Sequence, residues 1–303
     1  MTASLGVEVV RRSGTPLTAS SRLANRRRRW RSMLRRGSLS VLVWLVAVAF
    51  LVPLAWMISS SFKPNMDIMT PPTTLFPHPA TTANYGAVFS SPFFRWTANS
   101  VIVAVVRVTG TVVTSTLAGY AFARLRWRGR NVVFVLYLAV MGIPYQLLLI
   151  PRFIEFREIG LANTLWTLIL PGAFSAFGAF LMRQFFMSIP QDFIDAARVD
   201  GASQLVALRR VIVPLAAPAI AALAMVDFIW SWNDYETPLV MISSVGRYTI
   251  PLGLTTINSV EGGGLTPGPI LAGSVLSLIP VAAIFLGLQR QFQRAVLGSG
   301  VKG

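Results

Sequence analysis

The stretch Ser188–Pro214, SIPQDFIDAARVDGASQLVALRRVIVP, is the longest charged, amphipathic interval between two apolar segments of the chain. Pro190 suits a first helical position, and Asp192 and Asp195 in the opening turns favour the positive end of a helix dipole. Gly201 then ends the helix, because only glycine takes the left-handed closing conformation without strain. The sequence therefore predicts a short helix that stops at a glycine.

The residues after this glycine predict a second helical turn, which Ser203 can cap. Before the glycine, the small pair Ala196-Ala197 leaves a shallow surface between acidic groups, where a groove of another protein could come close. An amphipathic helix of a cytoplasmic loop can equally lie at the membrane interface without a protein partner. The residues of this interval alone leave both interpretations open.

The composition of the whole chain is that of an integral membrane protein. Of its 303 residues, 54% are hydrophobic and only 13% are charged, whereas a soluble domain of this size would need more polar surface. The chain has no cysteine and one histidine, His78. Disulfide bonding, zinc coordination and Ser-His or Cys-His catalysis therefore lack the residues they need.

Six apolar segments each approach the roughly 20 residues that cross a bilayer. They predict an all-α, polytopic membrane protein with six transmembrane helices, over Leu39–Ser61, Thr97–Ala123, Val132–Pro151, Thr164–Met187, Val211–Trp232 and Ile270–Gln289. The first segment is too long for a cleaved signal peptide and has no small-residue cleavage site after its apolar core. We therefore expect it to be retained as a transmembrane helix.

The basic residues predict which side of the membrane each loop occupies. Of the 27 Lys and Arg, 21 lie in the N-terminal tail, the loop Arg124–Arg130, the Arg183–Arg210 region and the C-terminal end, and only five lie on the opposite side. The positive-inside rule therefore places both termini and the Ser188–Pro214 loop in the cytoplasm. Most of the net charge of +16 is then an orientation signal, so we expect no nucleic-acid partner.

These segments divide the chain into four predicted regions. They are a basic cytoplasmic tail that we expect to be disordered (1–37), a first transmembrane helix with a proline-rich external loop (38–94), a transmembrane core that contains a cytoplasmic helix over 190–206 (95–289), and a cytoplasmic C-terminal tail (290–303).

The Ser188–Pro214 loop resembles the cytoplasmic loop of binding-protein-dependent ABC importer permeases, whose pattern is E-A-A-x-x-D-G-A with a proline further on. The matching residues are Asp195, Ala196, Ala197, Asp200, Gly201 and Ala202, with Pro214 downstream. The first position is Asp rather than Glu, which keeps the charge and shortens the side chain. In that family the loop forms a coupling helix that docks in a cleft of the ATPase subunit, so the resemblance implies this role for these residues.

Further stretches resemble the maltose-type carbohydrate branch of these permeases, and they follow one another in the family's order. They are SSSFKP at 59–64, Asn84-Tyr85, Asn99-Ser100, LAGYAFARLRWRGR at 117–130, Ile143-Pro144, Ile150-Pro151, Trp232-Asn233-Asp234 and the terminal Val301-Lys302-Gly303. The last three residues look like the tail of the second permease subunit, which implies a contact of Val301, Lys302 and Gly303 with the ATPase. The resemblance implies a type I ABC importer permease fold with six transmembrane helices.

The same resemblance implies an assembly in the cytoplasmic (inner or plasma) membrane. A second permease subunit, two cytoplasmic ATPase subunits and an extracytoplasmic solute-binding protein would act with this chain to import a carbohydrate by alternating access. ATP and Mg²⁺ would bind to the partner subunits, because this chain has no G-x-x-x-x-G-K-[ST] loop to hold phosphates. We therefore expect a transport subunit that binds no cofactor and is not itself an enzyme.

Two other classes of function fit the sequence less well. An ion-coupled secondary transporter would act without an ATPase and would ordinarily show paired charges or broken helices in repeated halves. A membrane-embedded enzyme is less compatible with the sequence, because no predicted span contains Cys or His.

Four polar residues in or beside the spans are candidates for the transport pathway. Arg107 lies near the middle of the second span and Asp227 lies inside the outer end of the fifth. A central charge costs at least about 2.5–3.5 kcal/mol in a bilayer, so we hypothesise that these two residues pair with each other or border the pathway. Asn233 and Asp234 follow the fifth span and are either a hydrated helix end or part of the external mouth.

Overall fold

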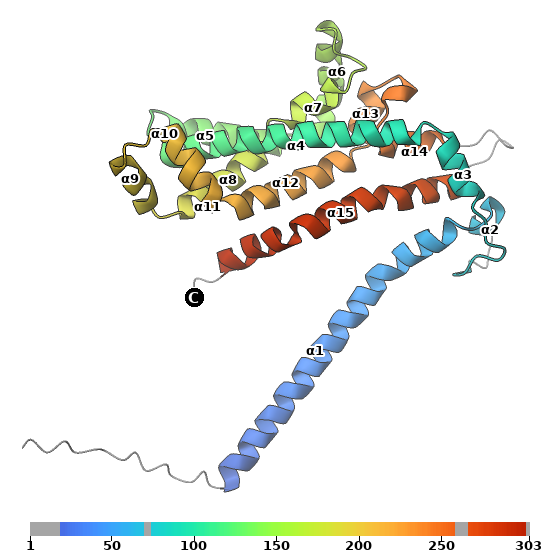
Figure 1. The fold of residues 1–303 in the computed structure, drawn as a ribbon, viewed down its shortest axis with the longest axis horizontal. Coiled ribbons are helices and arrows are strands. Elements are labelled where there is room, and N and C mark those ends of the chain that lie inside the picture. Colours follow the sequence, from blue (N-terminus) through green and yellow to red (C-terminus); the bar gives the residue numbers. More distant parts are fainter. Residues whose placement is uncertain (1–18, 70–73, 258–265, 301–303) are drawn as a thin grey trace, which may run out of the picture. The chain divides into compact units, whose positions relative to one another are not determined.

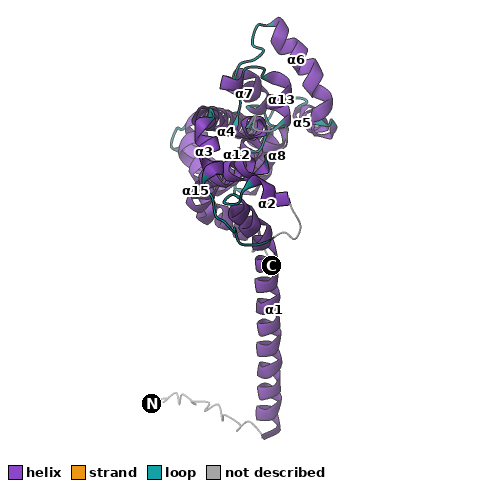
Figure 2. Ribbon diagram, turned by 90° about the vertical axis from the view of Figure 1, so that its right-hand side faces the viewer, coloured by secondary structure: helices purple, strands orange, loops and turns teal. Residues whose placement is uncertain are grey.

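The computed structural model describes residues 19–69, 74–257 and 266–300 of the chain. In these ranges every regular element is helical, and Figure 2 shows helices and loops there but no strand. The chain divides into two compact units, Met1–Trp56 and Met57–Gly303. The prediction of an all-α fold is confirmed.

The first unit contains most of helix α1 (Ala19–Ser60). The sequence predicted a disordered tail over residues 1–37, but residues 19–37 are helical. The reason is that this stretch has no proline and is rich in Arg, which favours helix. Residues 1–18 lie outside the described residues. From Ser40 to Ser60 the helix is long and apolar enough to cross a membrane.

The second unit contains three further helical segments of this kind. They are α4 (Phe93–Arg124), the pair α7 (Trp166–Gly172) and α8 (Ala176–Ser188), and the Pro267–Gly287 part of α15 (Pro267–Gly300). The two remaining predicted spans are helix pairs bent by 91° and 77°. The described residues thus hold four spans, or six if each bent pair counts as one.

The third predicted span, Val132–Pro151, is not one straight helix. Helix α5 (Arg130–Ala139) ends in a 3-10 turn at Gly142, and after a sharp bend the chain continues in the 3-10 turn Tyr145–Leu148 and α6 (Leu149–Glu158). Pro144 causes the break, because it lacks an N–H and disfavours helical conformation in the residue before it. Ile143 is accordingly extended, with φ −89° and ψ 117°.

The fifth predicted span, Val211–Trp232, is also interrupted. After α10 (Gln204–Ala207) the chain forms a π-helix, Leu208–Ile212, and the short α11 (Val213–Leu215), and then bends into α12 (Ala217–Trp232). Prolines at 214 and 218 lie on either side of the bend. Each removes one backbone donor, so the hydrogen-bond ladder cannot run through.

Helix α4 is the centre of the second unit and packs against α7, α8, α12 and α14 (Ile250–Thr256). Its contact with α8 is close because Gly119 has no side chain: a Cβ there would lie 2.6 Å from the Cβ of Met182. The hydroxyl of Thr111 donates to the carbonyl of Gly172 at 2.7 Å, and that of Thr114 to Ala173 at 2.6 Å. Small residues and hydroxyls therefore join α4 to α7 and α8, as is usual between membrane helices.

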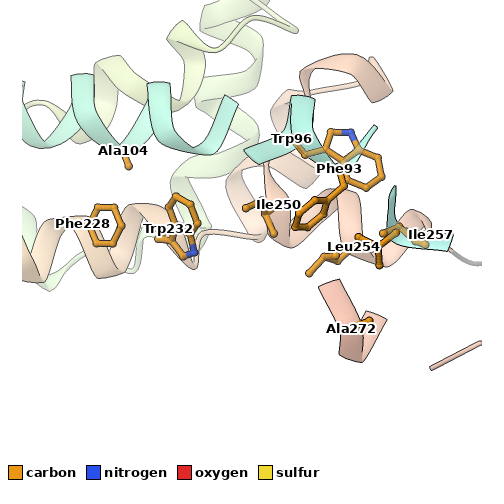
Figure 3. Packing of buried hydrophobic residues seen from close by; sticks show 10 residues of the cluster. Phe93, Trp96, Ala104, Phe228, Trp232, Ile250, Leu254, Ile257 and Ala272 are labelled. Atoms are coloured by element: carbon orange, nitrogen blue, oxygen red, sulfur yellow. The ribbon is translucent and has the colours of Figure 1, made fainter. Parts of the chain in front are cut away.

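Two apolar clusters lie at opposite ends of this unit. One gathers residues of α4, α12, α14 and α15, among them Trp96, Trp232 and Leu254 (Figure 3). Around it lie the shorter helices α2 (Asn65–Met69), α3 (Ala83–Ser90) and α13 (Glu236–Met241). The other cluster joins α4, α8 and α12 to α9 (Asp192–Val199), which Figure 1 shows with α10 at the far end of the unit.

Candidate functional site

The charged interval between α8 and α12 folds as two short helices. Helix α9 begins at Asp192, after Pro190, and ends in a Schellman motif in which Gly201 N–H donates to Arg198 and Ala202 N–H to Ala197. Gly201 has φ +79°, the conformation that the sequence predicted. Pro190 is not helical, unlike the sequence expectation, and the region predicted over 190–206 contains the two short helices and the glycine break that the sequence indicated.

The second helix, α10, begins as expected. The hydroxyl of Ser203 accepts a hydrogen bond from the backbone N–H of Val206 at 3.4 Å, which caps the helix. We call residues 191–207, which include α9, the glycine break and α10, the α9–α10 segment.

Helix α9 is attached to the unit by one buried side chain. Ile194 is 1% exposed and packs in the cluster with Phe186 and Leu208. Other apolar side chains of the segment are exposed: Phe193 by 49%, Val199 by 88% and Leu205 by 67%. Outside the spans, such exposure is typical of a protein interaction surface. The sequence analysis did not identify these three residues as part of a site. Their position could have indicated one, because they are apolar and do not lie on the helix face that carries Ile194.

Arg107 and Asp227 are brought together from α4 and α12. The Nη2 of Arg107 lies 3.5 Å from Oδ1 of Asp227, and its Nη1 lies 3.9 Å from Oδ2 of Asp234. The side chain of Asp227 is only 3% exposed. Arg107 and Asp227 thus lie within ion-pair distance, and Asp234 is a second acidic neighbour of the same guanidinium.

A cavity of about 630 Å³ borders this ion pair. Its lining comes from α4, the 3-10 turn Tyr145–Leu148, α6, α7, α12, α13 and the residues between the last two. It consists of Arg107, Tyr145, Arg152, Thr167, Leu168, Pro171, Gly172, Ile229, Trp230, Asn233, Asp234, Tyr235, Glu236 and Thr237. Arg107, Asn233 and Asp234 therefore line one space, whereas Asp227 lies behind Arg107. Tyr145 donates a hydrogen bond to Glu236 across it.

Gly172 makes room for Arg107 at the wall of this cavity. A Cβ on Gly172 would lie 2.3 Å from Nε of Arg107, so a larger residue there would displace the guanidinium. Among the described residues, Nε of Arg107 and Oδ2 of Asp227 are buried without a hydrogen-bond partner. The ion pair is thus held by packing and by charge rather than by a complete set of hydrogen bonds.

Val301, Lys302 and Gly303, for which the resemblance implies a contact with an ATPase, lie outside the described residues. The described chain reaches Gly300 within α15. The role of these three residues stays a prediction, as does that of Asp195, Ala196, Ala197, Asp200, Gly201 and Ala202.

Residues 112–298 match the family described as the binding-protein-dependent transport system inner membrane component. The chain belongs to this family. The matched range is more than half of the permease and includes the α9–α10 segment, Asp227 and the part of the cavity contributed by α6, α7, α12 and α13.

Relatives of this permease are similar over nearly their whole length. The arabinooligosaccharides transport system permease protein AraQ of Halalkalibacterium halodurans is 32% identical over 89% of this chain and 100% of its own. The galactooligosaccharides transport system permease protein GanQ of Bacillus subtilis is 32% identical, over 87% of this chain and 94% of its own. The osmoprotective compounds uptake permease protein GgtD of Synechocystis is 34% identical, over 87% and 92%.

Solved structures give the same result for the fold. A bacterial ABC transporter that imports the acidic polysaccharide alginate matches with a TM-score of 0.73 and 26% identity, over 86% of this permease and 97% of that chain. The fold is therefore that of a type I ABC importer permease, as the sequence resemblance predicted. The family match gives no support to an ion-coupled secondary transporter.

Proposed function

We propose that this chain is the transmembrane permease subunit of an ATP-driven importer that moves a carbohydrate by alternating access. The observation that carries the proposal is the lining of the cavity. Three aromatic side chains, Tyr145, Trp230 and Tyr235, lie there with charged groups of both signs. Such a lining suits a sugar, whose C–H faces pack on aromatic rings and whose hydroxyls both donate and accept hydrogen bonds.

The charges of the cavity favour a neutral or weakly charged substrate. Arg107 and Arg152 face Asp234 and Glu236 in the lining, so positive and negative side chains balance. Guanidinium groups donate and carboxylates accept, and a sugar hydroxyl can do both at once. Oligosaccharides named for the relatives AraQ and GanQ are therefore the first substrates to test.

The proposed assembly contains a second permease subunit, two ATPase subunits and an external solute-binding protein. Membership of a binding-protein-dependent family supports the ATPase and the binding protein as partners, and the exposed α9–α10 segment is the surface on which we place the ATPase. ATP and Mg²⁺ would bind to the ATPase subunits, and this chain would bind no cofactor and catalyse no reaction. The arginine-rich ends of the spans support a cytoplasmic position for the termini and for α9.

Uptake of labelled oligosaccharides into proteoliposomes that contain the whole complex tests the proposal. We expect uptake to require ATP inside the vesicles and the binding protein outside. Trp230→Ala should reduce it, because the substrate loses an aromatic surface, whereas Trp127→Ala, in the Arg124–Arg130 loop outside this cavity, should not. Uptake driven by an ion gradient without ATP would contradict the proposal.

A further inference from the structure

The C-terminal end of α4 holds the start of the α9–α10 segment through Arg124. The Nη1 of Arg124 donates to Oε1 of Gln191 at 2.7 Å, and its Nη2 donates to the carbonyls of Phe186 and Ile189. Gln191 in turn donates from Nε2 to Oδ1 of Asp195 at 3.2 Å. A chain of hydrogen bonds therefore runs from α4 through Gln191 to the first turn of α9.

One turn earlier, α4 also holds the far side of the segment. The hydroxyl of Tyr120 lies 2.8 Å from Oε1 of Gln204, to which it donates, and Gln204 is the first residue of α10. The ring of Tyr120 packs edge-on against Phe186 with centroids 6.3 Å apart. Tyr120 is 4% exposed. Two residues of one helix, four positions apart and so on one face, thus contact the segment before and after α9.

These contacts matter because α9 has few others. Its eight residues are too few to form a stable helix alone, and Ile194 is its one buried residue. Tyr120 and Ile194 belong to the same apolar cluster. The hydrogen bonds of Tyr120 and Arg124 therefore fix the orientation of a helix that the burial of Ile194 alone would leave free to turn.

Helix α4 connects this attachment to the cavity. It runs from Phe93 to Arg124 as one helix, unlike the two bent spans. At 1.5 Å per residue, Arg107 lies about 26 Å along the axis from Arg124. The close contact at Gly119 keeps the intervening part against α8.

We propose that Tyr120 and Arg124 are positioning residues that fasten the α9–α10 segment to α4, so that a movement of α9 is carried along α4 to Arg107 at the cavity. This inference rests on the proposed function, in which an ATPase moves α9. It adds a defined route for the movement. The movement passes from α9 through Gln191 and Gln204 into the continuous helix α4, and α4 carries it to Arg107, which faces Asp227 and Asp234.

The first experiment measures ATP hydrolysis by the reconstituted complex, with and without the loaded binding protein. Tyr120→Phe removes only the hydroxyl and keeps the ring, so the chain should fold. Since one hydrogen bond is at stake, we expect stimulation by the binding protein to fall about two- to tenfold. Arg124→Ala removes three bonds of a charged donor, and stimulation should fall by more than about tenfold. Basal hydrolysis should continue in both variants.

Matched variants separate this role from a general loss of structure. Tyr137→Phe removes a hydroxyl on α5, and Arg126→Ala removes an exposed arginine of the neighbouring loop; both should keep native stimulation. Gln204→Ala should reduce the stimulation of ATP hydrolysis as much as Tyr120→Phe does. The double variant should lose no more stimulation than either single variant, because both changes remove the same hydrogen bond. Additive losses would overturn the assignment of this pair.

A distance measurement tests the transmission itself. The chain has no cysteine, so spin labels can be placed at Leu117→Cys on α4 and Val199→Cys on α9, both at exposed positions. We expect one narrow distance distribution that is the same without nucleotide and with ATP, and a broader one after Arg124→Ala. A native distance that changes by a helical pitch, about 5.4 Å, would overturn the inference.

The outcomes distinguish this inference from the function on which it rests. If the native complex shows stimulated hydrolysis and Tyr120→Phe and Arg124→Ala show it equally, the inference is wrong and the proposed function stands. If the native complex shows no ATP-dependent uptake, the proposed function is wrong.

Discussion

Arg107 carries one positive charge and has two carboxylates beside it, Asp227 at 3.5 Å and Asp234 at 3.9 Å. The three groups therefore bear a net negative charge in a region where charge is expensive. Asp227 is the more deeply buried acid and depends on Arg107, whereas Asp234 borders the cavity.

We expect Arg107→Met to destabilise the chain strongly. It leaves the carboxylate of Asp227 buried without its cation, and breaking a buried pair in this way costs about 3–5 kcal/mol. The double variant Arg107→Met/Asp227→Leu should recover much of that loss, because no charge is left unpaired. Thermal unfolding of the purified chain in detergent measures both. Arg152→Met, which leaves the pair in place, serves as the control.

A second prediction at this scale concerns Gly119. Its missing Cβ allows the backbones of α4 and α8 to approach, so Gly119→Val should push the helices apart and lower the unfolding temperature. The size of the effect should correspond to about 1–3 kcal/mol, the usual range for overpacking. Gly86→Ala, on α3 where nothing lies within 4 Å of the added Cβ, should have little effect. Equal stability of Gly119→Val and the native chain would contradict the packing described.

Among the helices, the ends that depend on neighbouring residues were predicted correctly from the sequence. Gly201 ends α9 and Ser203 caps α10 as the sequence indicated, since each depends on its own backbone and near neighbours. The break at Pro144 was not predicted, because a proline can also be accommodated within a membrane helix when neighbours satisfy the freed groups. The start of α1 at Ala19 was not predicted for a different reason: the basic composition of residues 1–37 indicated disorder, although residues 19–36 contain neither proline nor glycine.

The glycine break gives the prediction for the coupling role. We expect a variant with Asp195→Ala and Gly201→Pro to assemble but to lose most of its substrate-stimulated ATP hydrolysis. Proline cannot take the positive φ of Gly201, so the end of α9 must rearrange, and the bond from Gln191 to Asp195 is lost as well. Ser90→Ala, on the exposed end of α3, is the control. Unchanged stimulation and uptake would mean that α9 is only an interfacial helix.

For the whole molecule, the sequence predicted the fold more completely than the site. Apolar length and arginine bias predicted the class of protein, because a bilayer constrains both. The cost of charge within a span indicated that Arg107 and Asp227 either pair or border the pathway, without deciding between the two. The contacts of Tyr120 with Gln204 and of Arg124 with Gln191 join residues far apart in the chain, and only the packing of α4 against α8 brings them together.

Labelling from each side of the membrane tests the proposed orientation. Val199→Cys on α9 and Ser90→Cys on α3 are exposed and lie toward opposite ends of the second unit (Figure 1). In intact cells a membrane-impermeant maleimide should label Ser90→Cys and not Val199→Cys, and in inverted vesicles the result should be reversed. Labelling of both from one side would contradict the predicted topology.

The π-helix at Leu208–Ile212 has an evolutionary consequence. A π-turn contains one residue more than an α-turn, and each residue of a helix turns the chain by about 100°. A homologue that lacked this one residue would form a regular α-helix here, and the residues on either side would keep nearly the same orientation, because the wider turn contains the extra residue. A single-residue gap between Gln204 and Pro214 in an alignment should therefore be compatible with the Tyr120–Gln204 hydrogen bond, whereas a gap of two residues would rotate α10 by about 100° and would identify relatives whose ATPase meets a different face of α9.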